Sequence, residues 1–222
     1  MTGSGSFSFG GREVAAGYDD VMVPILFGPW ATRLLAEHDD WTGMTVLDLA
    51  AGTGVVAREL VERVGSEGGV IASDISGAML EHARRRCEGS VPAVRFVEGP
   101  AHPLDLPDAS VDGIVCQQGF QFFPDRPAAA HEMARVLRGG GRVLASTWRP
   151  VDECELFGWI CEALRAIDAP EIAELMRAPF DFLPETELRE TFEDAGFRDV
   201  EVGVRSHPMA STGGVEQAIT IV

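Results

Sequence analysis

The chain has 222 residues, of which 45% are hydrophobic and 24% are charged, and its formal net charge is −17 at pH 7. Such a length and composition are typical of one globular domain with a sizeable core. The excess of negative charge opposes attraction to nucleic acid and to anionic lipid, so we expect neither as a partner.

The N-terminal stretch is rich in Gly and Ser, so we predict a flexible start over residues 1–17. It resembles neither a signal peptide nor a membrane-spanning segment, and we expect no membrane insertion. The four cysteines, Cys87, Cys116, Cys154 and Cys161, form no C-x-x-C pair and have no His at metal-ligand spacing. We therefore expect no metal site, reduced thiols and a cytoplasmic protein.

Residues 18–40 are apolar at steps of three and four, which predicts helix, with Pro24 and Pro29 as breaks. The segment forms either two helices or one kinked helix. Because it precedes the first predicted strand, it lies outside the sheet.

A strand, a glycine turn and a helix follow at residues 46–49, 51–54 and 55–64. Gly52 and Gly54 let a ligand approach the backbone closely, and the first N–H groups of the helix point to the same place. The motif therefore predicts a site for a nucleotide-like ligand.

Gly52 to Ala57 also satisfies the G-x-G-x-x-G/A pattern of dinucleotide-binding proteins. However, Asp48 at the strand end would face the phosphates of such a ligand. Two unit charges ~4 Å apart interact by about 4 kcal/mol at an effective dielectric constant near 20, so Asp48 favours a cationic ligand. S-adenosylmethionine, which has a sulfonium, an ammonium and a nucleoside without phosphates, meets this requirement.

Asp74 ends the next apolar run, 20 residues past Gly54. A carboxylate at this strand tip accepts hydrogen bonds from ribose hydroxyls in dinucleotide folds. The alternative is that Asp74, or Ser76, caps the helix that follows.

The later segments alternate in the same way. We predict strands over residues 94–98, 111–117 and 142–148, and a helix over 126–137 that Gly139 to Gly141 stop. Alternating strands and helices indicate a parallel, doubly wound sheet.

Beyond Pro150 we predict an amphipathic helix over residues 156–167, an irregular connection over 170–184, a helix over 188–195 and a strand over 198–205. Residues 215–222 form either a closing strand of the sheet or the start of a further helix.

Four motifs between residues 18 and 149 carry a resemblance to a known family. They are Asp48-x-Ala50-x-Gly52-x-Gly54, Ser73-Asp74-Ile75-Ser76 with Met79-Leu80, Leu106 to Asp112, and Arg135 to Arg142. In this order and spacing they resemble the class I S-adenosylmethionine-dependent methyltransferases, in the small-molecule branch that includes the ubiquinone and menaquinone biosynthesis methyltransferases.

The resemblance implies a doubly wound, mostly parallel, seven-stranded Rossmann-like sheet, complete or incomplete, with helices on both faces and an N-terminal helical lid. The alternative for the lid segment is that it only packs on the sheet. In this organisation residues 18–222 form one methyltransferase domain, with a lid at 18–40, a cofactor-binding core at 44–149, a helical insertion at 150–185 and a C-terminal helix and strand at 186–222.

The resemblance also implies the site residues. Gly99-Pro100-Ala101 stands where the family often has Gly-Asp-Ala, so we expect adenine recognition to rest on backbone groups and packing, with the Ala101 N–H as a donor. The cofactor-binding candidates are Tyr18, Asp48, Ala50, Gly52, Thr53, Gly54, Asp74, Ile75, Met79, Pro100, Ala101, Gln117 and Gln118, and the candidates for binding the acceptor are Phe120, Phe122, Trp148 and Arg149.

The expected activity is in-line transfer of a methyl group from S-adenosylmethionine to a small-molecule acceptor, with S-adenosylhomocysteine as product. Positioning alone accounts for ~7–11 kcal/mol of such a barrier. No histidine stands at the motif position of a general base, so we name no catalytic residue. The alternatives are a non-catalytic module that binds the cofactor and a nicotinamide-dependent dehydrogenase. The acceptor, the methylated atom and the oligomeric state, with a homodimer as one alternative, stay open.

Overall fold

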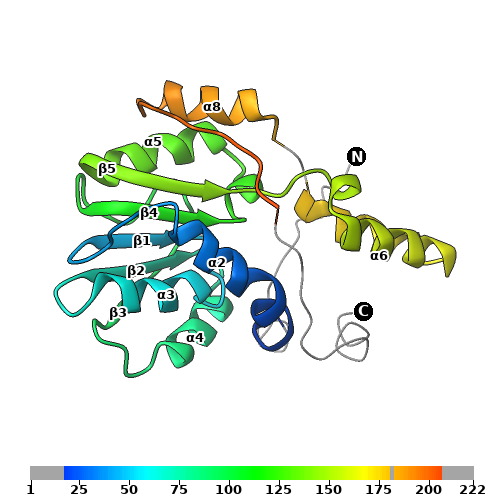
Figure 1. The fold of residues 1–222 in the computed structure, drawn as a ribbon, viewed down its shortest axis with the longest axis horizontal. Helices are drawn as coiled ribbons and strands as arrows, with labels where there is room; N and C mark the ends of the chain where they lie inside the picture. Colours follow the sequence, from blue (N-terminus) through cyan, green and yellow to red (C-terminus); the bar gives the residue numbers. More distant parts are fainter. Residues whose placement is uncertain (1–17, 181–182, 207–222) are drawn as a thin grey trace.

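The computed structural model describes residues 18–180 and 183–206 and contains one parallel sheet (Figure 1). Its strands lie in the order β3-β2-β1-β4-β5, and every neighbouring pair is parallel. The strands are β1 (Thr45–Leu49), β2 (Gly69–Asp74), β3 (Val94–Glu98), β4 (Val111–Gln117) and β5 (Leu137–Ser146). The predicted parallel α/β sheet is confirmed, and the described residues form five of the seven expected strands.

Helices cover both faces of this sheet (Figure 1). They are α2 (Gly28–Leu35), α3 (Val55–Val64), α4 (Gly77–Arg86), α5 (Arg126–Val136) and α8 (Glu185–Asp194). Two further helices, α6 (Glu155–Ala166) and α7 (Pro170–Arg177), pack on each other beyond the end of β5. Neighbouring residues of a strand point to opposite faces. Val46 accordingly packs in the core under α2 and α3, whereas Leu47 packs in the core under α5 and α8.

The segment before the sheet forms two helical pieces, one of the two predicted alternatives. A π-helix, η1 (Tyr18–Phe27), contains Pro24 and continues into α2, whose buried Leu35 packs in the core under α3. A proline has no N–H to donate, so the position of Pro24 inside η1 is consistent with the irregular hydrogen bonding of this helix.

Two predicted boundaries around the glycine triplet are wrong. The helix α5 ends at Val136 and passes directly into β5, so Gly139 to Gly141 lie within the strand. Val111 pairs with Leu137, but Gly113 already pairs with Arg142. The triplet therefore bulges out of the ladder, with Gly140 at φ +83°. Regular pairing begins at Arg142, where the strand was predicted, and it ends at Ser146.

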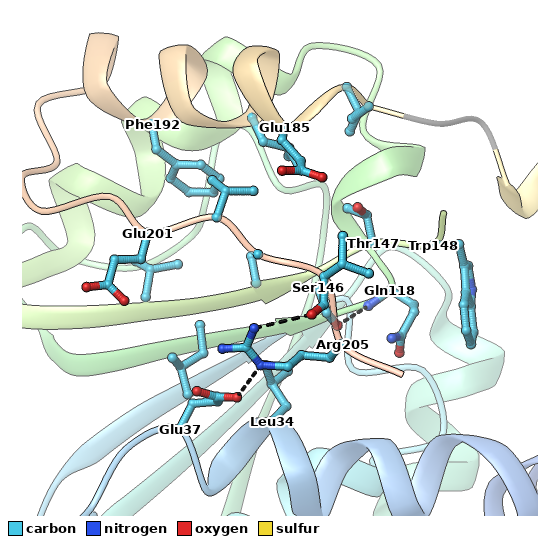
Figure 2. A pocket seen from close by; sticks show the side chains of 18 of the residues that line it. Leu34, Glu37, Gln118, Ser146, Thr147, Trp148, Glu185, Phe192, Glu201 and Arg205 are labelled. Carbon is cyan, nitrogen blue, oxygen red and sulfur yellow. Dashed lines mark hydrogen bonds and ion pairs between the residues drawn. The ribbon is translucent and has the colours of Figure 1, made fainter. Parts of the chain in front are cut away.

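The C-terminal part also differs from the prediction. Residues expected to form an irregular connection contain α7 and a 3₁₀ turn, η4 (Ala178–Phe180). Residues 198–206 form no strand and run beside β5 as an irregular strap (Figures 1 and 2). The expected flexible start at 1–17 and the two alternatives for 215–222 lie outside the described residues. Among the residues that the structure describes, no helix is long and apolar enough to span a membrane.

Candidate functional site

The glycine loop between β1 and α3 turns through three left-handed residues. Ala50, Gly52 and Gly54 have φ values of +60°, +53° and +80°. A Cβ added to Gly52 would meet no atom within 4 Å, so open space lies beside this backbone. A Cβ added to Gly54 would lie 3.0 Å from the side chain of Ala83 in α4. Because α4 approaches so closely, glycine fits best at this position.

Asp48 is a buried carboxyl at the end of β1. Its side chain is 1% exposed and accepts a hydrogen bond of 2.9 Å from the backbone N–H of Ala57, in the first turn of α3. Burial raises the pKa of Asp48 to about 8, the hydrogen bond from Ala57 opposes this rise, and the nearby Asp74 adds to it. A cation bound nearby would favour the ionised form.

Asp74 joins the glycine loop to the start of α4. Its two carboxyl oxygens accept hydrogen bonds of 2.8 Å from the backbone N–H groups of Gly52 and Ser76. Burial raises its pKa, against the effect of these N–H donors. The helix cap itself is Ser76, whose hydroxyl accepts from the Met79 N–H. Asp74 thus lies at the tip of β2, one strand away from Asp48.

The tip of β4 contributes two glutamines. The Gln117 Nε2 donates to the backbone oxygen of Phe27 at 2.9 Å, which links the sheet to η1. The Oε1 atoms of Gln117 and Gln118 are buried and have no hydrogen-bond partner within the described residues. Buried oxygens of this kind normally have a donor, and an ammonium group would supply one.

Strained backbone marks the tips of the same strands. Gln118 has φ +46°, and Ala50, beyond β1, has φ +60°. Non-glycine residues in this region cost of order 1–3 kcal/mol and cluster at functional sites. Both strained residues belong to the loops at the carboxyl ends of β1 and β4, where ligands bind in open α/β sheets.

Four of the cofactor-binding candidates lie in three different environments. Ile75 is 75% exposed and Met79 only 3% exposed, whereas Pro100 is exposed and Ala101 packs partly against the core under α5. Ile75 therefore offers the larger apolar surface to a ligand. The backbone of Tyr18 belongs to η1, but its side chain lies outside the described residues.

Of the four acceptor candidates, Trp148 and Arg149 line one groove, whereas Phe120 and Phe122 do not line it. Phe120 is fully buried and stacks on Phe192 at a centroid distance of 5.1 Å, so it is a core residue here and not a wall for an acceptor. Phe122 is 38% exposed on the turn η2 (Phe120–Phe122). Arg149 forms ion pairs with Glu153 and Glu185.

Trp148, the fourth candidate, lies in an aromatic cluster just past β5. Its ring centroid is 6.2 Å from that of Phe27, 6.2 Å from that of Phe157 and 5.6 Å from that of Phe180. The cluster thus joins the N-terminal segment, α6 and η4 at the carboxyl end of the sheet.

An open groove of about 2220 Å³ begins at this cluster and follows the free edge of β5. Figure 2 shows Gln118, Ser146 and Trp148 at one end and the strap with Glu201 and Arg205 along the side. The apolar lining near Trp148 includes Ile25, Leu26, Trp30, Phe157 and Ile160.

Sequence reasoning missed one buried group near the site. Asp19 is 0% exposed and forms an ion pair with Arg86 of α4. The available signal was the acidic pair Asp19-Asp20, directly after Tyr18 at the start of an otherwise apolar helical segment.

Comparison with known proteins gives a consistent result. Residues 46–141 match the family model described as methyltransferase domain. The chain is 32% identical over 243 residues to the ubiquinone/menaquinone biosynthesis C-methyltransferase of Xanthomonas campestris, with 96% of this chain and 94% of the relative aligned. The enzyme of the same name from Francisella tularensis is 37% identical over 138 residues, which cover 60% of this chain and 55% of the relative.

A solved structure supports the fold. The crystal structure of an S-adenosylmethionine-dependent methyltransferase from Aquifex aeolicus superposes with a TM-score of 0.62 at 22% identity, covering 85% of this chain and 89% of that one. At this identity the match shows a shared fold.

Proposed function

The chain belongs to the S-adenosylmethionine-dependent methyltransferases, and from this premise we propose that it transfers a methyl group to a small, apolar, aromatic acceptor. The cofactor follows from the family. The nature of the acceptor is our inference from the residues around the groove.

The main support for this cofactor site is a pair of carboxyl groups, those of Asp48 and Asp74, at the tips of two neighbouring strands. Asp48 and Asp74 flank the glycine loop, and they are close enough for Asp74 to raise the pKa of Asp48. Two acidic side chains facing one site disfavour phosphates and favour a cation. Asp74 accepts two N–H groups already and has further lone pairs for ribose hydroxyls.

Other groups around the loop fit S-adenosylmethionine as well. Open space beside Gly52 leaves room for a ligand against the backbone, and exposed Ile75 offers apolar surface for the adenine. The unpartnered Oε1 atoms of Gln117 and Gln118 suit the ammonium. We assign the remaining contacts to the residues expected from the sequence, namely Tyr18, Ala50, Thr53, Gly54, Met79, Pro100 and Ala101.

We assign the parts of the chain accordingly. Residues 18–40 act as lid, 44–149 as cofactor-binding core, 150–185 as helical insertion and 186–222 as C-terminal part of one domain. We also propose that the sheet continues beyond β5 toward seven strands, because β5 is an edge strand of the described sheet. The four free cysteines support a cytoplasmic location.

The aromatic cluster supports an apolar acceptor. Trp148 and Phe157 line the groove at the carboxyl end of the sheet, together with Trp30 from the lid. Aromatic walls of this kind bury large apolar surfaces and stack on aromatic ligands. The curated relatives are named as C-methyltransferases of ubiquinone and menaquinone biosynthesis, so we propose a hydroquinone-like ring, methylated on carbon.

Methylation at carbon forms a ring C–CH3 bond as the S–CH3 bond breaks, and the hydrogen on that ring carbon leaves as a proton to solvent. The main task of the protein is therefore positioning. S-adenosylmethionine supplies a methyl group that its sulfonium already activates. The glycine loop, Asp74 and the two glutamines bind and orient the cofactor, and the aromatic residues hold the acceptor and exclude water. Positioning of this kind accounts for ~7–11 kcal/mol of the barrier.

A transfer assay tests the acceptor class. The protein is incubated with methyl-labelled S-adenosylmethionine and a panel of hydroquinones, phenols and amines, and mass spectrometry locates the label. We expect label on a ring carbon of a hydroquinone and an increase of the acceptor KM in Trp148→Ala, with no change in the exposed control Ile167→Ala. Transfer to amines alone would contradict this assignment.

A further inference from the structure

An ionic cluster holds the N-terminal segment on the body of the protein. Its centre is Asp19 in η1, whose side chain is 0% exposed. The Arg86 Nε lies 2.7 Å from Asp19 Oδ2, the Arg58 guanidinium lies 3.2 Å from Oδ1, and the His82 Nε2 lies 3.4 Å from Oδ2. Arg58 belongs to α3, and the other two residues belong to α4.

Asp19 stays ionised in this environment. Burial by itself raises the pKa of its carboxyl, but the Thr53 hydroxyl and the guanidiniums of Arg58 and Arg86 outweigh that effect and hold the pKa below its usual value. A buried carboxylate is stable only while its partners are in place, and removal of one partner is strongly unfavourable. The ion pairs of Asp19 with Arg58 and Arg86 are therefore expected to form and break together.

The same cluster reaches the glycine loop. Arg58 donates from one guanidinium nitrogen to the Thr53 backbone oxygen at 2.9 Å and from another to Asp19 at 3.2 Å. Thr53 lies between Gly52 and Gly54 and is 1% exposed. Arg58 thus ties the N-terminal segment to the loop that we assign to the cofactor.

The far end of the same segment is tied to another strand tip. Gln117 donates to the backbone oxygen of Phe27, the last residue of η1. The segment is consequently fixed at Asp19 beside α3 and α4 and at Phe27 beside β4. Of the two attachments, only the one at Asp19 depends on buried charge.

We propose that Asp19 is a positioning residue that latches the lid through Arg58 and Arg86, and that release of this latch sets the rate at which the cofactor leaves. This inference rests on the function proposed above, because it takes the glycine loop as the cofactor site. The latch itself is a property of the ligand-free protein and can be tested without any cofactor.

The test compares two neighbouring arginines of α4. Arg86→Gln removes the shortest ion pair of the cluster, whereas the control Arg85→Gln removes an arginine that is 54% exposed and pairs with Glu81 of the same helix. The first measurement is hydrogen–deuterium exchange of residues 18–27 in the ligand-free proteins. We expect faster exchange there in Arg86→Gln, wild-type exchange in Arg85→Gln, and partial recovery in Arg86→Lys.

The second measurement is the dissociation rate of S-adenosylhomocysteine by stopped-flow fluorescence. We expect Arg86→Gln to release it about tenfold faster, because the buried Asp19 carboxylate then lacks one charged partner and the attachment of the lid is weaker. Thermal melting of each variant, with Asp19→Asn as a second latch variant, separates this effect from loss of the fold.

The outcomes distinguish the two proposals. If the wild type binds no S-adenosylhomocysteine, the assigned cofactor site is wrong. Hydrogen–deuterium exchange of the ligand-free proteins still tests whether the latch exists. If the amide hydrogens of residues 18–27 exchange at the wild-type rate in folded Arg86→Gln and Asp19→Asn, the proposal of a latch is overturned. If exchange rises but dissociation does not, the latch exists and its control of cofactor release is overturned.

Discussion

Ala50 and Gly119 bring the tips of β1 and β4 into contact. A Cβ built on Gly119 would lie 2.5 Å from the Cβ of Ala50 and 3.1 Å from the sulfur of Cys116, so only glycine fits at this position. The contact fixes the distance between the glycine loop and the loop that carries the two glutamines. The proposed cofactor site therefore depends on the absence of a side chain at Gly119 as much as on the polar groups around it.

Gly119→Ala should destabilise the protein by about 1–3 kcal/mol, the usual cost of overpacking, and thus lower Tm by roughly 2–12 °C. Ala50→Gly removes the closer of the two clashes and suits the φ of +60° at this position. The double variant should regain part of the lost Tm. Additive effects of the two substitutions in thermal melts would show that the two residues do not touch.

Asp48 should release a proton when a cationic cofactor binds. With its pKa raised to about 8, the carboxyl is mostly protonated at pH 7, and a nearby cation favours the ionised form. Calorimetric titration with S-adenosylmethionine at pH 7, in buffers of different ionisation enthalpy, should show release of up to about one proton. Asp48→Asn keeps an acceptor for the Ala57 N–H and should abolish the release, whereas the exposed control Asp39→Asn should not.

The same raised pKa gives a dependence of stability on pH in the absence of ligand. The folded chain keeps the Asp48 proton up to about pH 8, whereas the unfolded chain loses it near the ordinary value of 3.8. The folded state thus binds more protons in between, so the contribution of Asp48 to the free energy of unfolding declines as pH rises from about 4 to 8. Asp48→Asn should flatten this part of the profile in denaturant titrations, and an unchanged slope would contradict the raised pKa.

Phe120 and Phe122 should respond differently to truncation, although they are two residues apart. Phe120→Ala should cost about 3–5 kcal/mol, because its ring is fully buried and stacked on Phe192. Phe122→Ala, at a side chain that is 38% exposed, should cost less than about 1 kcal/mol. Urea titrations of both variants measure these values, and equal losses would mean that the loop packs differently.

Local patterns predicted several elements around the glycine loop well. The helix α3 and the strands β3 and β4 have the predicted bounds, because apolar periodicity and flanking turn residues define them within a few residues. Asp74 stands at a strand tip for the same reason. The left-handed φ values of Gly52 and Gly54 agree with the need for glycine in that turn.

Features that depend on distant packing were not predictable. The glycine triplet gives a turn signal, yet pairing with β4 draws it into β5 as a bulge. The aromatic run from Phe120 to Phe123 has no period that would identify the buried ring. The ion pair of Asp19 and Arg86 joins residues 67 positions apart, and no local pattern predicts such a contact.

The most direct test of this account is a calorimetric titration of the wild type and of Asp74→Ala with S-adenosylhomocysteine, with the exposed Asp39→Ala as control. We predict binding by the wild type and the control, and binding weaker by about 1.5–3 kcal/mol in Asp74→Ala, as expected for hydrogen bonds to a charged group. Equal affinity of all three proteins would contradict the placement of the ribose at Asp74. No binding by the wild type at millimolar concentration would contradict the assigned cofactor.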